Sequence, residues 1–146
     1  MRQVLIAALL FAAAAAADAQ VVEYQVEGDG IPKPLTGIPG NPTRGRQLLL
    51  AREPANCLEC HTIAKDKAMG GGTRAPALDG IGAVLSPAQL RLSVVDYSQV
   101  VPKAGMPSFH KKEGGLFTAK QDREKPVLNA QQIEDVVAYL SSLKVR

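Results

Sequence analysis

The chain has 146 residues, which is the size of one domain, and its 17 Lys and Arg against 14 Asp and Glu give a net charge of +3. The basic residues form no stripe with interleaved aromatics, which argues against a nucleic-acid-binding protein. There is no Trp, and aromatic residues make up only 4% of the chain. A small domain with so few large rings often gains stability from a cofactor, a metal or a disulfide.

An export signal is predicted at the N-terminus. Arg2 precedes an unbroken apolar run from Val4 to Ala17, and Ala17-Asp18-Ala19 fits a small-x-small cleavage site. The apolar run is too short for a membrane anchor, because spanning a bilayer takes about 20 residues. We therefore predict a signal peptide over residues 1–19 and a mature protein that is soluble in the periplasm.

Residues 20–41 are rich in Gly and Pro and show no helical periodicity. This composition predicts an extended leader rather than an element of the core. The compact domain is expected to cover residues 42–146.

The first helix of that domain is predicted over residues 44–52, and Pro54 ends it. Residues 68–72 are a Gly-rich loop. The run Ser86-Pro87-Ala88-Gln89 is a helix start with Ser as cap, Pro in the first turn and Gln three residues after the cap. Loop character returns over residues 101–113.

The last helix has the clearest pattern. Asn129 is its predicted cap and Gln132 completes a capping box. One apolar stripe follows at i, i+3, i+4 and i+7: Ile133, Val136, Val137 and Leu140. No segment alternates between apolar and polar residues in the manner of a strand, so the domain is predicted to be mostly α-helical with long loops.

The chemistry is concentrated in Cys57-Leu58-Glu59-Cys60-His61, which has the C-x-x-C-H spacing of c-type haem attachment. Two thiols one helical turn apart can each add to one of the two vinyl groups on the porphyrin edge. The next residue then places its imidazole beneath the ring, within reach of the iron. The motif predicts one covalent haem c at Cys57 and Cys60, with His61 as the proximal ligand.

Two cysteines at this spacing have other uses in proteins. A redox-active disulfide is possible in an oxidising compartment, but the strand–helix flanks of thioredoxin-like proteins are missing. A structural disulfide closing so short a loop would remove little chain entropy. Zinc would need a fourth ligand, and the only other histidine is His110. A haem-free thiol–disulfide protein remains the alternative.

The far face of the iron needs a second ligand, and a thioether there would raise the reduction potential. Met69 lies eight residues after His61, too near to reach that face easily. Met106 lies 45 residues after His61 and precedes a proline, so we favour it as the distal ligand over an ordinary core role. His110 is the rival, although its two lysine neighbours suggest a solvated edge.

From about Thr43 to Leu143 the chain resembles the class I cytochromes c. The matching features are Gly45-Arg46-Gln47-Leu48, the C-x-x-C-H motif, Met106-Pro107 and Val137-Ala138-Tyr139-Leu140. The resemblance implies an all-α class I cytochrome c fold in which the first and last helices cross, with Gly45 against the Tyr139 side of the last helix. It also implies that the Pro76 carbonyl accepts a hydrogen bond from His61.

Longer stretches at residues 76–82, 86–96, 101–109 and 128–140 resemble SoxX, the monohaem subunit of the SoxAX cytochrome of sulfur oxidation. This resemblance implies a SoxA-like partner that carries the catalytic haem and a cysteine persulfide. The complex would be an L-cysteine S-thiosulfotransferase that couples thiosulfate to a cysteine of a SoxYZ-like carrier. The present chain would pass the electrons to a small soluble cytochrome. A free-standing electron shuttle is the alternative.

Two further inferences concern that partner. Once Cys57 and Cys60 hold the haem, no thiol remains for covalent sulfur chemistry, so any persulfide must lie on another chain. The leader could lie along the partner's surface, an idea that deletion of residues 20–40 would test.

Overall fold

The computed structural model describes residues 21–64, 71–111 and 125–145. Its elements, in chain order, are α1 (Pro42–Leu50), η1 (Cys57–Glu59), α2 (Ile81–Val84), α3 (Pro87–Asp96), η3 (Tyr97–Gln99) and α4 (Ala130–Ser142). These residues contain no strand, and Glu27 and Gly30 form an isolated antiparallel bridge. The predicted all-α fold is therefore confirmed. No helix within the described ranges is long and apolar enough to cross a membrane.

Side-chain caps fix where the longer helices begin. The Asn41 side chain accepts hydrogen bonds from the backbone N–H groups of Thr43 and Arg44, so α1 starts and ends two residues earlier than predicted. Both predicted capping boxes are present. They pair the side chains of Ser86 with Gln89 at α3 and of Asn129 with Gln132 at α4.

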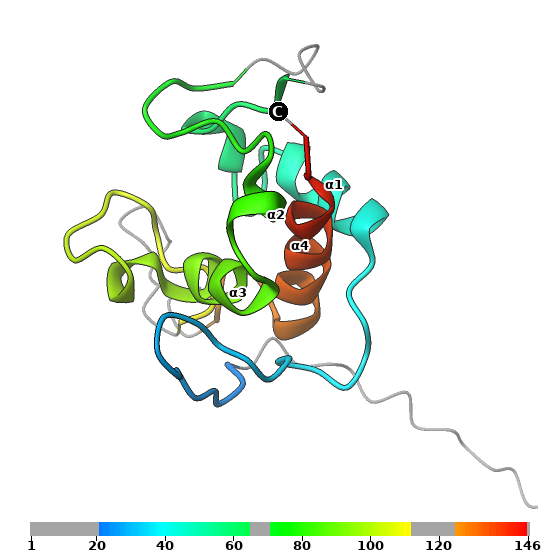
Figure 1. Cartoon of the computed structure of the whole chain (residues 1–146), viewed down its shortest axis with the longest axis vertical. Helices are drawn as coiled ribbons and strands as arrows, with labels where there is room; N and C mark the ends of the chain where they lie inside the picture. Colours follow the sequence, from blue (N-terminus) through cyan, green and yellow to red (C-terminus); the bar gives the residue numbers. More distant parts are fainter. Residues whose placement is uncertain (1–20, 65–70, 112–124, 146) are drawn as a thin grey trace, which may run out of the picture.

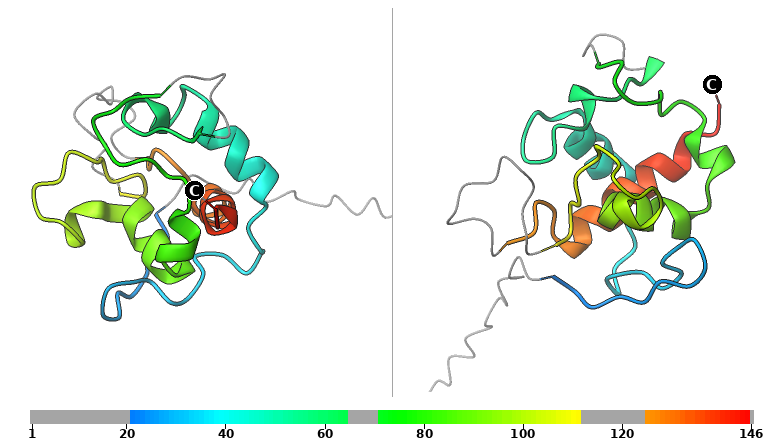
Figure 2. Two further views of the ribbon diagram at one scale, coloured as in Figure 1. Left: turned by 45° about the horizontal axis from the view of Figure 1, so that its top comes forward. Right: turned by 90° about the vertical axis from the view of Figure 1, so that its left-hand side faces the viewer.

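Helix α4 is the centre of the fold. Helix α1 crosses it on one side and α3 packs on the other (Figures 1 and 2). Helix α2 closes its C-terminal end, because the Gly82 N–H donates to the Leu143 carbonyl at 3.0 Å and the Lys144 ammonium donates to the Gly82 carbonyl at 2.6 Å. The candidate haem-attachment segment follows α1, which packs directly on α4.

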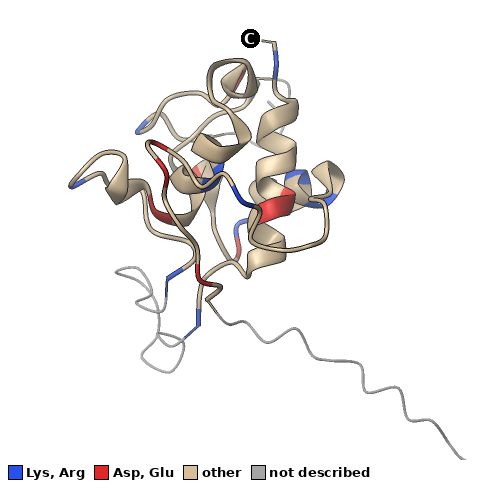
Figure 3. Cartoon of the chain, turned by 60° about the horizontal axis from the view of Figure 1, so that its bottom comes forward, with Lys and Arg blue, Asp and Glu red and all other residues tan. Residues whose placement is uncertain are grey.

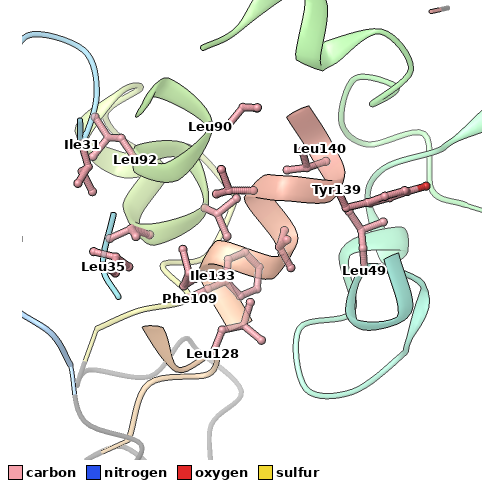
Figure 4. Close-up of a cluster of buried hydrophobic side chains, with 14 of the residues drawn as sticks. Ile31, Leu35, Leu49, Leu90, Leu92, Phe109, Leu128, Ile133, Tyr139 and Leu140 are labelled. Atoms are coloured by element: carbon pink, nitrogen blue, oxygen red, sulfur yellow. The ribbon is translucent and has the colours of Figure 1, made fainter. Parts of the chain in front are cut away.

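The α1–α4 crossing depends on Gly45. A Cβ at this position would lie 1.9 Å from the backbone oxygen of Asp135, so only glycine allows the observed approach. The expectation that Gly45 would meet the Tyr139 side of α4 is confirmed, because Asp135 lies on that side, one turn before Tyr139. Tyr139 itself lies beside Leu49 of α1 (Figure 4).

An ion pair lies next to this crossing. The Arg44 guanidinium contacts the Asp135 carboxylate at 2.7 Å, and the acidic turn of α4 lies beside basic positions of α1 (Figure 3). The Asn41 N–H also donates to Asp135 at 2.7 Å. Asp135 thereby fixes the start of α1 against α4.

The segment before α1 is extended, as predicted, but the expectation that it lies outside the core is wrong. Ile31 is fully buried and Leu35 is 9% exposed, and both belong to the core cluster with Leu92 of α3 (Figure 4). The Ile31 N–H donates to the Ala88 carbonyl at 3.0 Å. Lack of periodicity correctly indicated an absence of helix but did not reveal that single apolar side chains are buried.

A buried ion pair joins this segment to both long helices. Arg91 of α3 and Glu134 of α4 form a bidentate pair at 2.7 and 2.9 Å, and each side chain is only 6% exposed. Arg91 also donates to the Ile31 carbonyl at 2.6 Å, and the Leu35 N–H donates to Glu134 at 2.8 Å. The backbone of the leader thus satisfies polar groups that the helices alone would leave buried.

Candidate functional site

The two cysteines lie on a single tight turn after α1. Asn56 adopts a left-handed backbone conformation (φ 47°) and begins η1. The N–H groups of Cys60 and His61 both donate to the Cys57 carbonyl, at 3.3 and 3.1 Å. Cys57 and Cys60 are half-buried free thiols, and the turn brings them together with His61 as the motif predicted.

A second segment, residues 71–79, runs alongside this turn. Its backbone N–H groups at Gly72, Ala75 and Leu78 donate to carbonyls of the attachment segment at 2.8, 3.1 and 2.9 Å. At Gly72 the contact requires glycine, because a Cβ would lie 2.0 Å from the Glu59 backbone oxygen. This pairing places the Pro76 carbonyl next to the His61 ring.

His61 has a defined orientation. Its Nδ1 lies 2.7 Å from the Pro76 carbonyl oxygen. A carbonyl can only accept, so Nδ1 carries the proton and the lone pair of Nε2 is free for a metal. The hydrogen bond implied by the resemblance is thus present, while the role of His61 at an iron stays a prediction.

The Cys57 thiol lacks the lowered pKa that is typical of reactive cysteines. Burial raises its pKa to about 11, with a smaller opposing effect of a backbone hydrogen bond. Reactive cysteines of C-x-x-C redox proteins have lowered pKa values, because the thiolate is the nucleophile. The raised pKa of Cys57 therefore gives no support to the haem-free redox alternative.

Met106, the predicted distal ligand, is half-buried and packs against the core cluster. It lies in the loop that joins η3 to Phe109. The rival Met69 lies outside the described residues.

His110 is not the solvated residue that its lysine neighbours suggested. It is fully buried. Its Nδ1 donates to the Leu128 carbonyl at 2.8 Å, and its Nε2 accepts from the Val22 N–H at 3.0 Å. Both ring nitrogens are used by the backbone, so His110 offers no lone pair to an iron or a zinc ion. In the described ranges no group of three or more His, Cys, Asp or Glu side chains could hold a metal ion.

The donor set fits a haem c. Two free thiols lie three residues apart on one turn, in the C-x-x-C-H spacing of haem attachment, and an imidazole whose Nδ1 is held by the Pro76 carbonyl follows them. A half-buried thioether is available on a separate loop. Soft sulfur and imidazole donors of this kind suit iron in an electron-transfer site.

Sequence reasoning missed Asp96, which lies at the base of the Met106 loop. It is the last residue of α3, is fully buried and accepts hydrogen bonds from residues on both sides of that loop. A signal was present, because a carboxylate at a helix C-terminus is opposed by the helix dipole and needs another reason to be there.

Comparison with known proteins agrees with the assignment of a haem c site. The cytochrome c family model matches residues 42–144. No curated protein matches the chain. Among solved structures, a chain in the crystal structure of SoxXA from P. pantotrophus is 36% identical, with a TM-score of 0.75. That alignment covers 86% of this chain and 97% of the other.

Proposed function

The chain belongs to the cytochrome c family and carries a covalently attached haem c, and from this we propose that it is the electron-transfer subunit of a SoxAX-type L-cysteine S-thiosulfotransferase. The observation that carries the proposal is the similarity to a chain of SoxXA over almost its entire length. The resemblance at residues 76–82, 86–96, 101–109 and 128–140 supports it independently of the attachment motif.

When bound, the haem c supplies a one-electron couple at its iron. In our proposal Cys57 and Cys60 anchor the group as thioethers. His61 presents Nε2 to the iron, because the Pro76 carbonyl holds the proton-bearing Nδ1 on the other side of the ring. Met106 would supply a thioether as the second ligand, which would favour a reduction potential high enough to accept electrons.

The sulfur chemistry belongs to the partner. Joining thiosulfate to a cysteine thiol forms a sulfur–sulfur bond and releases one proton and two electrons. Both cysteines of this chain are used for attachment, so the thiol and any persulfide lie on a SoxA-like subunit and a SoxYZ-like carrier. This chain takes the electrons one at a time and passes them to a small soluble cytochrome. The predicted signal peptide places this exchange in the periplasm.

Haem attachment is tested first. We expect the secreted protein to retain haem on a denaturing gel and to lose it in the Cys57→Ala/Cys60→Ala double variant. Sequencing of the mature N-terminus should begin at Gln20.

The partner is tested by purifying the tagged protein from its native periplasm. A second c-type cytochrome at a fixed ratio is the expected result, together with thiosulfate-dependent reduction of a small cytochrome when the purified pair is supplied with a SoxYZ-like carrier as the acceptor thiol. A haem-stained protein that purifies alone would instead identify a free-standing shuttle.

A further inference from the structure

The loop that carries Met106, residues 97–108, is closed at its base by the backbone. The Phe109 N–H donates to the Val94 carbonyl and the His110 N–H to the Val95 carbonyl, each at 3.4 Å. These bonds are long, so they hold the two ends of the loop together only loosely.

The Asp96 carboxylate lies at the same base and makes shorter bonds. Its Oδ1 accepts from the hydroxyls of Ser98 and Ser108, both at 2.6 Å. Its Oδ2 accepts from the Gln99 amide at 2.8 Å and the Lys111 ammonium at 2.5 Å. One fully buried group thus bonds to two residues at the start of the loop and two at or just beyond its end.

These partners also keep Asp96 ionised. Burial alone would raise its pKa, but the bonds from Lys111, Ser108, Ser98 and Gln99 together hold the pKa well below its ordinary value. Hydrogen bonds to an ionised carboxylate are stronger than those between neutral groups.

The second half of the loop depends most on this carboxylate. Backbone hydrogen bonds within the described loop come from Val100, Val101 and Ala104, all of which belong to its first part. A Cβ at Gly105 would meet no atom within 4 Å, so the chain beside Met106 has free space around it. Ser108, two residues after Met106, is the nearest point at which Asp96 holds the chain.

We propose that Asp96 is a positioning residue for Met106, which fixes the loop so that the thioether stays on the iron. This inference rests on Met106 as the distal ligand in the proposed function. Without the carboxylate the loop would open more often, and a foreign ligand would compete more successfully for the vacated position.

The test is the displacement of Met106 by imidazole in the oxidised, full-length holoprotein. Binding is followed by loss of the near-infrared sulfur-to-iron band, and global stability is followed in parallel by far-ultraviolet circular dichroism in urea. We expect Asp96→Asn to raise the apparent imidazole affinity at least tenfold, the equivalent of about 1.4 kcal/mol of loop opening. Ser108→Ala, which removes one of the four bonds, should raise the affinity by a smaller factor.

Asp135→Asn is the matched control. Asp135 is 3% exposed and also accepts four hydrogen bonds, but its partners lie in α1, at the N-cap of α1 and in α4. We expect Asp135→Asn to lower global stability without changing imidazole affinity. Equal affinity changes in the two aspartate variants, or none in Asp96→Asn, would overturn the proposal. Should Asp96→Asn fail to fold, an unchanged affinity in Ser108→Ala would overturn it instead.

Failure of the underlying assignment gives a different result. A wild-type holoprotein without the near-infrared band would remove Met106 from the iron and this inference with it. Co-purification with a second cytochrome tests the proposed partner, and its outcome does not depend on whether Met106 binds the iron.

Discussion

Replacing Gly45 by alanine tests how far the α1–α4 crossing can yield. The new Cβ would lie 1.9 Å from the Asp135 oxygen, 2.5 Å from the Asp135 carbonyl carbon and 2.9 Å from the Val136 nitrogen. All three atoms are backbone atoms of a central helix, so none can rotate away. To reach ordinary contact the helices would have to separate by about 1.5 Å at this point.

Two effects of known size compete in this variant. Alanine in place of glycine favours a helix by about 1 kcal/mol. Overpacking a close-packed interface costs about 1–3 kcal/mol, and a gap of this width also forfeits roughly half of the dispersion energy around Leu49 and Tyr139. The steric cost therefore wins, and we expect Gly45→Ala to lower the free energy of unfolding by about 2 kcal/mol.

Urea unfolding of the holoprotein, followed by circular dichroism, measures this loss. Gly37→Ala is the control, because a Cβ at Gly37 meets no atom within 4 Å. Its stability should be unchanged or slightly raised, since alanine restricts the unfolded chain. A Gly45→Ala protein as stable as the wild type would refute the close approach described above.

Three other substitutions test the buried pair, the distal ligand and an acid-sensitive contact. Glu134→Gln should cost about 3–5 kcal/mol in urea unfolding, because it leaves the Arg91 charge buried without its partner. Met106→Ala should abolish the near-infrared band and lower the reduction potential measured by redox titration. The third is Asp135→Asn. Burial alone would raise the pKa of Asp135, but hydrogen bonds from Arg44, Asn41 and Gln131 hold it below its ordinary value of 3.8. A group whose pKa is lowered in the folded state stabilises the fold above its unfolded pKa and loses that contribution as the pH falls. Wild-type stability should therefore decline below about pH 5. Asp135→Asn should flatten part of this decline.

Each of these expectations has a contrary result. A loss below about 1 kcal/mol for Glu134→Gln would mean that water reaches the pair. An unchanged band in Met106→Ala would point to Met69. A pH profile of Asp135→Asn parallel to that of the wild type would show that this carboxyl is not held in its ionised form.

Local patterns in the sequence predicted local structure well. The capping boxes at Ser86 and Asn129 depend on residues three apart, and both are present as expected. The C-x-x-C-H motif is also local, and its chemistry could be inferred from spacing alone.

Long-range polar contacts could not be predicted in the same way. Arg91 and Glu134 are 43 residues apart, and neither position shows a pattern that identifies the other. His110 was placed at the surface because of its lysine neighbours, whereas its burial follows from two backbone partners, Val22 and Leu128, that lie far away in the sequence. The side of the last helix that meets Gly45 was predicted, but the contact point at Asp135, one turn before Tyr139, was not, because periodicity fixes the face of a helix and not the position of a contact along it.

The match to the cytochrome c family begins at residue 42, but the hydrophobic core also includes residues that precede it. The side chains of Ile31 and Leu35 are buried in the core, and their backbone groups form hydrogen bonds with the Arg91–Glu134 pair. A chain trimmed to the family boundary would admit water to a charge pair that the intact molecule keeps dry, so loss of partner binding after such trimming would report unfolding before it reported a lost contact. Because Ile31 and Leu35 are buried, this segment can contact another subunit only through exposed neighbours such as Ile38, which is 63% exposed.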